Sequence, residues 1–251
     1  MIGALSDREE TILELLADEP TISVVEVSKR LDVSAVTIRG DLSALAEKGL
    51  IVRERGRASA AIHPGIIKRQ RNRVDEKSRI AKAAANLIGD RDTVMIEAGT
   101  TTALVARYLL GKSDLHVVTT SMLVVPFARY NPSLRLTVVG GEFRPDSESV
   151  VGPVALRQLD GFHVNTAFVG TDGLTLEHGL TTHLIEGAEV VRTMAEHAER
   201  TVLVADSSKF GHAGFYRILP LEAVDILITD SGLSDEDAES IGSRGVSVMR
   251  V

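Results

Sequence analysis

Cysteine and tryptophan are both absent from the 251-residue sequence, and aromatic residues make up only 4% of it. Without cysteine, the chain can form neither disulfides nor thiolate metal sites. With so few aromatic side chains, the core has to be built from valine, leucine, isoleucine and alanine. Hydrophobic residues still make up 44% and charged residues 25%, a composition typical of a globular protein with one or two domains.

Long hydrophobic runs are missing as well. No stretch of about 18 apolar residues occurs, so the sequence predicts no membrane-spanning helix. The first ten residues, MIGALSDREE, lack the basic flank and the long apolar segment of a secretion signal. Together with the absence of cysteine, these features predict a cytoplasmic protein.

The charges are unevenly distributed along the chain, whose formal net charge is −7. Residues 1–28 carry a net charge of −6, residues 29–73 carry +7 and residues 74–251 carry −8. A basic segment of 45 residues therefore lies between two acidic ones. A solvated surface would explain such a segment, but the pattern inside it favours a nucleic-acid partner.

Three short helices are predicted within the first 50 residues. Two begin at serines with capping-box spacing, SDRE (6–9) and SVVE (23–26), and Ser34 caps the third. The third helix has apolar residues at positions 38, 42, 45 and 46, and Gly49 ends it. The segment LIVRERGRA (50–58) predicts two short strands with a turn near Gly56. Three helices and a basic hairpin form the winged variant of the helix-turn-helix motif.

The third helix would be the recognition helix, whose N-terminal half lies in the major groove of DNA. Arg39 suits a guanine or a phosphate, and the hairpin arginines suit the DNA backbone or the minor groove. Gly40 costs about 1 kcal/mol relative to alanine in a helix interior. The alternatives are a helical bundle used for protein contacts and a helix-turn-helix that binds no DNA. The expected DNA-binding residues are Ser34, Val36, Thr37, Arg39, Gly40, Ser43, Arg53, Arg55 and Arg57.

The segment SVVEVSKRLDVSAVTIRGDLSALAEKGLIVRERGRA (23–58) resembles the N-terminal domain of the DeoR family of bacterial sugar-metabolism repressors. We therefore expect a DNA-binding domain over residues 1–57, followed by a basic linker over 58–75. The sequence departs from the family pattern twice. The family usually has a second arginine where Gly40 stands and a glycine pair where Gly56 and Arg57 stand, and both differences concern which operator is recognised.

From residue 76 onward, apolar strands alternate with helices, which predicts an α/β domain with a mostly parallel sheet covered on both faces. Ligands of such sheets bind at the carboxyl ends of the strands. The expected strands are TVMIEA (93–98), LHVVTT (115–120), LRLTVVG (134–140), NTAFVG (165–170), RTVLVAD (200–206), DILITD (225–230) and VSVMRV (246–251). The expected helices cover 76–89, 101–111, 121–130, 150–159, 184–199 and 235–242.

Glycines and hydroxyl residues follow five of these strands. EAGTTT (97–102) leads into a helix, and its hydroxyls and N–H groups predict an anion cradle suited to phosphate, although a helix N-cap is the alternative. The segment lacks P-loop spacing and a lysine, so a nucleoside triphosphate is not expected. Asp172 suits sugar hydroxyls and Lys209 suits a phosphate. The expected ligand-binding residues are Glu97, Gly99, Thr100, Thr101, Thr102, Thr120, Ser121, Gly140, Gly141, Arg144, Gly170, Asp172, Gly173 and Lys209.

This part of the chain resembles the DeoR-type sensor domain, because AGTTT, GG..R, G.DG, DSSKF and ITD occur in that order. Glu97 departs from the aspartate that the family commonly has there. The sensor domain is similar in fold to ribose-5-phosphate isomerase. The resemblance implies a phosphorylated sugar as effector, double-stranded operator DNA as partner and assembly as a homodimer or homotetramer. We expect no cofactor, no metal ion and no catalytic residue.

An isomerase-like enzyme with a DNA-binding appendage is the alternative function, and a scaffold with a vestigial pocket is a third. Isomerase chemistry needs a carboxylate base, for which Glu186 and Glu189 are the candidates. Glu189 has the spacing to pair with Arg192 on one helix face, and EHGLTTH (177–183) lacks the lysine and glycine run of an isomerase. His178 and His183 are expected to contact ligand or solvent rather than a metal ion.

Overall fold

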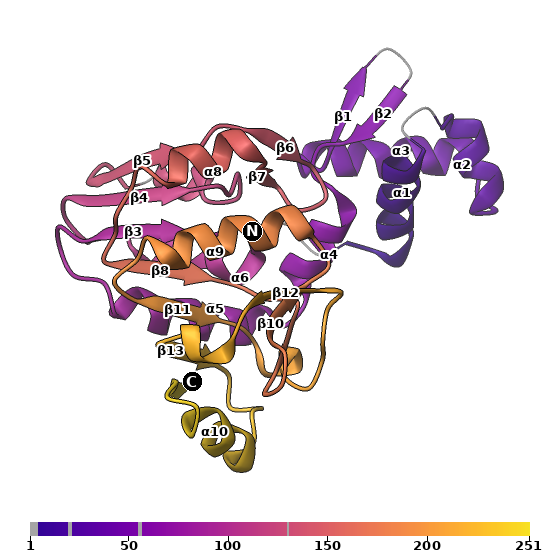
Figure 1. Cartoon of the computed structure of the whole chain (residues 1–251). Coiled ribbons are helices and arrows are strands. Elements are labelled where there is room, and N and C mark those ends of the chain that lie inside the picture. The colour runs from indigo at the N-terminus through magenta and orange to yellow at the C-terminus, as the bar shows by residue number, and fades with distance from the viewer. Residues whose placement is uncertain (1–4, 20–21, 55–56, 130) are drawn as a thin grey trace. The chain divides into compact units, whose positions relative to one another are not determined.

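The computed structural model describes residues 5–19, 22–54, 57–129 and 131–251, without the side chains of Glu54 and Arg57. The chain forms two compact units, Met1–Arg69 and Gln70–Val251, whose elements are labelled in Figure 1. Each unit has its own hydrophobic core. Among the described residues, every helix is too short or too polar to cross a bilayer.

The described part of the first unit has the helices and the hairpin of a winged helix-turn-helix fold, as predicted. Its hairpin strands are antiparallel, with Ile51 opposite Ala60. The elements are α1 (Asp7–Asp18), α2 (Val24–Arg30), α3 (Ala35–Glu47), β1 (Ile51–Glu54) and β2 (Arg57–Ala60).

Local signals in the sequence set the ends of these helices. Ser6 and Glu9 form the predicted capping box at the start of α1, and the side chain of Ser34 accepts a hydrogen bond from the N–H of Thr37 at the start of α3. Gly49, with φ of +71°, ends α3 in the left-handed conformation that favours glycine. The predicted helix signals are therefore confirmed at these positions.

The segment 58–75, expected to be a linker, contains the end of β2 and a further helix, α4 (Pro64–Arg71). The proline that suggested a linker occupies the first position of this helix, where its missing N–H leaves no hydrogen bond unmade. Ile67 packs into the core of the first unit, and the boundary between the units falls after Arg69.

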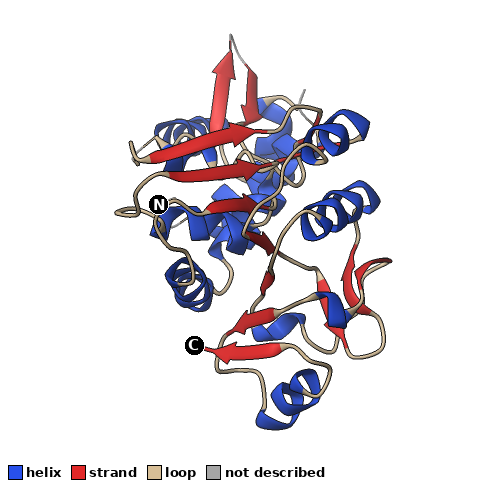
Figure 2. Cartoon of the chain, turned by 60° about the vertical axis from the view of Figure 1, so that its left-hand side comes forward, coloured by secondary structure: helices blue, strands red, loops and turns tan. Residues whose placement is uncertain are grey.

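The second unit is built on a seven-stranded sheet in which every pair of neighbouring strands is parallel. Figure 2 shows its strands in red between helices in blue. All seven strands that the apolar runs predicted are present. In spatial order they are β14 (Ser247–Arg250), β13 (Ile226–Thr229), β11 (Thr201–Val204), β8 (Thr166–Val169), β3 (Thr93–Ile96), β4 (Leu115–Thr119) and β5 (Leu134–Val138).

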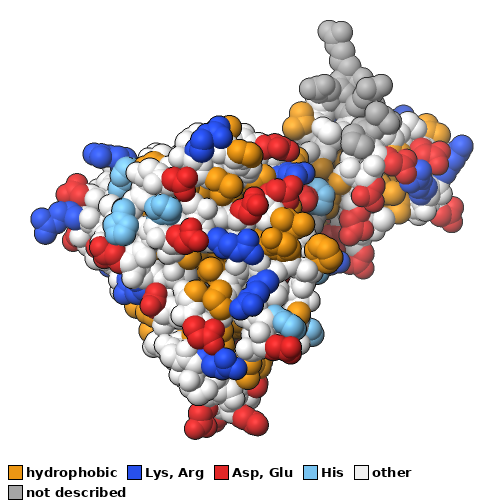
Figure 3. Space-filling view, in the orientation of Figure 1, with side chains coloured by type: hydrophobic (Ala, Val, Ile, Leu, Met, Phe, Trp, Pro, Cys, Tyr) orange, Lys and Arg blue, Asp and Glu red, His pale blue; other side chains and the backbone are white. Residues whose placement is uncertain are grey.

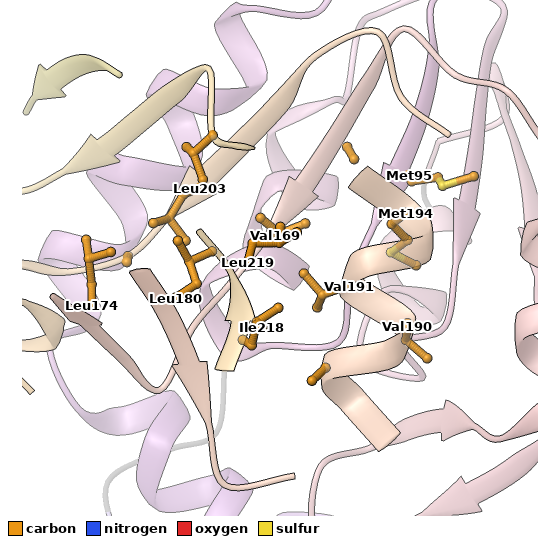
Figure 4. Packing of buried hydrophobic residues seen from close by; sticks show 14 of the residues in the cluster. Met95, Val169, Leu174, Leu180, Val190, Val191, Met194, Leu203, Ile218 and Leu219 are labelled. Carbon is orange, nitrogen blue, oxygen red and sulfur yellow. The ribbon is translucent and has the colours of Figure 1, made fainter. Parts of the chain in front are cut away.

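Helices cover both faces of this sheet. Alternate residues of β3 face opposite sides: Met95 lies in one core, while Val94 and Ile96 lie in the other. Figure 4 shows Val191 and Met194 of α9 (Ile185–Glu196) within the first of these cores. With α9 lie α8 (Pro153–Leu159) and α10 (Asp235–Gly242), and on the other side lie α5 (Val74–Asn86), α6 (Thr100–Tyr108) and α7 (Val125–Ala128).

Two small antiparallel sheets were not predicted. The helix expected over 150–159 begins only at Pro153, because the residues before it belong to a strand, and the helix expected over 121–130 is the short α7. The additional strands are β6 (Glu142–Arg144) with β7 (Ser149–Val151), and β9 (Gly173–Thr175) with β10 (Gly179–Thr182) and β12 (Tyr216–Leu219). Two 3₁₀ turns, η1 (Ser207–Lys209) and η2 (Leu221–Ala223), complete the unit.

Candidate functional site

The outer face of α3 carries the residues expected to contact DNA. Ile38, Leu42 and Leu45 face the core, and this places Val36, Arg39 and Gly40 on the opposite, exposed side of the helix. The hydroxyl of Ser34 lies 2.9 Å from that of Thr37 and also caps the helix. These two hydroxyls therefore hold each other at the N-terminus of α3, where free N–H groups suit a phosphate.

A wing arginine lies beside α3. Arg53 of β1 donates from Nη1 to the hydroxyl of Ser43 at 2.9 Å, and that hydroxyl donates in turn to the carbonyl oxygen of Arg39. Ser43 of the helix thus holds the side chain of Arg53 of the hairpin beside α3. Arg55 lies outside the described residues, as does the side chain of Arg57, whose backbone belongs to β2.

Two ion pairs that the sequence did not predict hold α3 in place. Arg8 of α1 forms two hydrogen bonds with Asp41, of 2.7 and 2.9 Å. Lys48 lies 2.7 Å from the carboxylate of Glu9, the residue that also completes the capping box of α1. Burial raises the pKa of Glu9, but the hydrogen bonds from Lys48 and Ser6 and the charge of Lys48 outweigh it, so the pKa lies below its ordinary value.

In the second unit, the strand order reverses between β3 and β8. The chain proceeds from β3 through β4 to β5 on one side, and then crosses to β8 on the other side of β3. Open parallel sheets bind ligands at such a switch point, outside the carboxyl ends of the strands. Glu97 follows β3 and Gly170 follows β8, so these two expected ligand-binding residues lie at this point.

Glu97 bridges the two strand ends. Its Oε2 accepts a hydrogen bond from the N–H of Gly170 at 3.1 Å. A Cβ at Gly99 or Gly170 would lie 3.3 or 3.1 Å from the same oxygen, so both glycines give the carboxylate its space. Four expected residues, Glu97, Gly99, Thr102 and Gly170, are thus brought together.

Gly99 is also the N-cap of α6, which begins with the three threonines. Thr102 is fully buried and donates its hydroxyl to the carbonyl oxygen of Gly99 at 3.0 Å, so it stabilises the turn. Thr101 is buried and Thr100 is half-buried. Because the N–H groups of the first turn have no partner within the helix, the start of α6 is suited to an anion.

Two hydroxyl groups at the end of β4 are buried without a partner. Thr120 and Ser121 are 0% exposed, and neither Thr120 Oγ1 nor Ser121 Oγ has a hydrogen-bond partner among the described residues. In the sheet, Thr119 of β4 lies opposite Ile96 of β3. Thr120 and Glu97, the residues that follow them, therefore leave neighbouring strands at the same edge of the sheet. Buried hydroxyls are normally hydrogen-bonded, so these two groups call for a partner that the described residues do not supply.

The residues after β5 are held by other parts of the unit. The N–H of Gly140 donates to the side chain of Gln158, and a Cβ at Gly141 would lie 2.7 Å from the carbonyl oxygen of Val151. Arg144 forms an ion pair with Glu186 at the start of α9. The pKa of Glu186 lies below its ordinary value because of a hydrogen bond with its own backbone and the neighbouring charge of Arg144.

Asp172 and Gly173 lie in the β9–β10 hairpin. Oδ2 of Asp172 accepts hydrogen bonds from the hydroxyl of Thr182 at 2.8 Å and from the N–H of His183 at 3.1 Å. A Cβ at Gly173 would lie 2.3 Å from the carbonyl oxygen of His212. Hydrogen bonds thus hold Asp172, and close backbone packing surrounds Gly173; that these two residues bind a sugar stays a prediction.

Lys209 lies in η1, directly after β11. Its side chain is half-buried and has no hydrogen-bond or ion-pair partner within the described residues. Its ammonium group therefore stays available to an anion.

Sequence reasoning missed Arg73, which precedes α5 and adopts a left-handed backbone conformation with φ of +54°. Its guanidinium lies 3.0 Å from Asp230 and 3.4 Å from Asp206, whose side chains are 3% exposed, and it also donates to Ser207 at 3.2 Å. Arg73 thus connects the start of the second unit to the ends of β11 and β13. These contacts join residues more than 130 positions apart, and no local motif signals them.

The remaining candidates are Glu189 and two histidines. Arg192 donates to the carbonyl oxygens of Ile218 and Arg217 rather than pairing with Glu189, so the predicted helix-face pair is wrong. His178 and His183 are exposed, and the described residues hold no cluster of three or more potential metal ligands.

Family models match both units of the chain. A model described as "DeoR-like helix-turn-helix domain" matches residues 8–63, and one described as "DeoR C terminal sensor domain" matches residues 72–231. The chain is 34% identical over 249 residues to the HTH-type transcriptional regulator GlpR of Haloferax volcanii, with 97% of each chain covered. It is 30% identical over 247 residues to the HTH-type transcriptional repressor GlcR of Bacillus subtilis, covering 97% of this chain and 95% of that one.

Solved structures show weaker likeness. Ribose 5-phosphate isomerase A from Methanocaldococcus jannaschii is 21% identical, with a TM-score of 0.40 over 55% of this chain and 54% of that chain. The full-length sorbitol operon regulator SorC from Klebsiella pneumoniae is 10% identical, with a TM-score of 0.42 over 95% of this chain and 100% of that chain.

Proposed function

Because the chain belongs to the DeoR family of transcriptional regulators, we propose that it represses a sugar-catabolic operon and is released from its operator by a phosphorylated sugar. The first unit binds double-stranded DNA through α3 and the wing. The second unit receives the sugar phosphate at the switch point between β3 and β8. The protein acts in the cytoplasm, where its operator and its effector are both present.

The observation that supports the effector site is a set of groups without a partner in the described part of the chain, at the carboxyl ends of β3, β4 and β11. The free N–H groups at the start of α6 and the unpaired cation of Lys209 suit a phosphate. The buried hydroxyls of Thr120 and Ser121 suit the hydroxyls of a sugar. One ligand with a phosphate at one end and hydroxyls at the other would satisfy all of these groups together.

Control of DNA binding would follow from linkage between the two sites. A sugar phosphate that binds better to the arrangement with low operator affinity shifts the population toward that arrangement, so the overall affinity for the operator falls, and operator DNA reciprocally weakens sugar binding. Two-fold operators require at least a dimer. Exposed hydrophobic residues on the second unit, namely Phe143 of β6, Val154 of α8 and Ile185 of α9, support a homo-oligomer, and hydrophobic side chains lie among charged ones on the face in Figure 3.

The experiment that tests this proposal is a thermal-shift panel of pentose and hexose phosphates with the purified chain. We expect at least one sugar phosphate to raise the melting temperature of the wild type and to release it from promoter DNA, because a ligand that binds only the folded state stabilises it. Lys209→Ala should lose both effects while retaining DNA binding. If no phosphorylated sugar shifts the melting temperature, or if Lys209→Ala responds normally, the proposed site is wrong.

An isomerase is the rival function. Its two candidate bases are poorly placed for proton abstraction, because Glu186 is paired with Arg144 and Glu189 is exposed on α9. Turnover of pentose or hexose phosphates by the purified chain would favour the rival, and we expect none.

A further inference from the structure

Val36 is the most exposed large hydrophobic residue of the described part of the first unit. Its side chain is 74% exposed at the start of α3, whereas Ile38, Leu42 and Leu45 of the same helix are buried. Val36 does not belong to the core of the unit, so folding does not require an apolar residue there. The side chain of Val36 is therefore available to contact a partner of α3.

The polar groups near Val36 are mostly engaged within the protein. Ser34 and Thr37 are bonded to each other, and the Ser43 hydroxyl bonds both to Arg53 and to the carbonyl oxygen of Arg39. The side chain of Arg39 is exposed and forms no ion pair or hydrogen bond in the part of the chain that the structure describes. Val36 and Arg39 are therefore the two side chains on this face that are available to read bases.

Gly40 leaves the surface next to Val36 open. It lies one turn further along α3, and a Cβ built there would meet nothing within 4 Å. The helix consequently shows bare backbone beside the exposed valine. Bases at the floor of a groove can come close to Val36 without meeting a side chain at position 40.

We propose that Val36 packs against the C5-methyl group of a thymine while Arg39 binds a guanine one or two base pairs away. The thymine methyl is the apolar feature that base pairs present in the major groove, and arginine pairs with O6 and N7 of guanine. Residues three apart on a helix have Cβ atoms about 5–6 Å apart. Successive bases are about 3.4 Å apart along the DNA, which sets the spacing of the two contacts.

This inference rests on the proposed function, in that α3 has to lie in the major groove. It adds a sequence requirement: each operator half-site contains a thymine within two base pairs of a guanine. It also assigns to Val36 a role in recognising the operator sequence. Exposure alone would not indicate this role, because single exposed apolar residues are common on protein surfaces.

The test begins by selecting binding sites for the full chain from random double-stranded DNA. Each thymine of the selected site is then replaced by deoxyuridine, which lacks only the methyl group. We expect one position per half-site at which the wild type loses about fourfold in affinity, the effect of removing one buried methyl group. That position should lie within two base pairs of a conserved guanine.

Variants identify the residue that senses the methyl group. Val36→Ser should bind the selected site more weakly and bind the thymine and deoxyuridine versions equally, whereas Val36→Ile should retain the difference. Val138→Ser, at a 40% exposed valine of β5 in the second unit, is the matched control and should behave as wild type. Circular dichroism would verify that each variant is folded.

Two results would overturn the inference: no thymine at which deoxyuridine weakens wild-type binding, or an unchanged penalty in Val36→Ser. Failure of the wild type to bind any duplex would instead refute DNA binding through α3, so the two failures are distinguishable.

Discussion

Two glycines show how differently single positions can be constrained. A Cβ at Gly173 would lie 2.3 Å from the carbonyl oxygen of His212, so any side chain there requires the backbone to move. Gly40 has open space around it and lies inside α3. The sequence suggested a binding role for both, because it shows where a glycine stands but not what approaches it.

Replacing these glycines with alanine should have opposite effects on stability. Gly40→Ala should raise the free energy of unfolding of the first unit by up to about 1 kcal/mol, because alanine favours the helix. Gly173→Ala should lower that of the second unit by about 1–3 kcal/mol, as overpacking does. Urea denaturation measures both. A destabilised Gly40→Ala variant would show that the helix needs glycine there.

At the level of elements, apolar runs were enough to predict the strands of the main sheet. Strands such as β8 are buried on both faces and contain almost only apolar residues. Strands such as β6 and β9 have three residues each and include charged residues or glycine, so they give no periodic signal. Arg73 was missed for a similar reason, because its partners Asp206 and Asp230 become neighbours only when the sheet forms.

The Arg73 cluster should make the stability of the second unit depend on pH. Burial raises the pKa of Asp230, but hydrogen bonds from Ser207 and Gly232 and the charge of Arg73 outweigh it, so its pKa lies below the ordinary value. As the pH falls, Asp230 is therefore protonated at a higher pH in the unfolded chain than in the folded protein. The corresponding stability should be complete at neutral pH and be lost progressively below about pH 5.

Denaturation with urea between pH 3 and pH 7 would check this dependence. Asp230→Asn should reduce the loss of stability at acidic pH, whereas Asp114→Asn, at an exposed turn with positive φ, should leave it unchanged. Equal pH dependence in wild type and Asp230→Asn would show that this carboxylate does not contribute.

Over the whole molecule, the net charge does not show how the basic residues are distributed along the chain. The chain carries −7 overall, yet residues 29–73 carry +7, and this segment includes α3 and the wing. The cations are therefore concentrated in one segment of the chain rather than spread over a whole unit. The sequence shows this distribution of charge directly, but it gave no signal for α4 (Pro64–Arg71), which follows the hairpin and within which the first unit ends, after Arg69.

Operator affinity should fall steeply with salt despite the negative net charge. If each first unit of a dimer neutralises two or three phosphates, the slope of log K against log salt concentration should be roughly −4 to −5. Arg53→Gln should reduce the magnitude of that slope by about 2 per dimer if Arg53 contacts a phosphate. Titrations by fluorescence anisotropy at several potassium chloride concentrations would measure it, and a flat dependence would contradict contacts with the DNA backbone.

The hydrogen bond between Glu97 and Gly170 has a consequence for biosynthesis, since it joins residues 73 positions apart. During translation, β3, β4 and β5 leave the ribosome well before β8. A nascent chain can therefore begin its sheet at one edge, but it lacks one wall of the proposed sugar-phosphate site until β8 has been inserted beside β3. Ribosome-bound intermediates shorter than this should be unable to respond to the metabolite, whatever the state of their already completed DNA-binding segment.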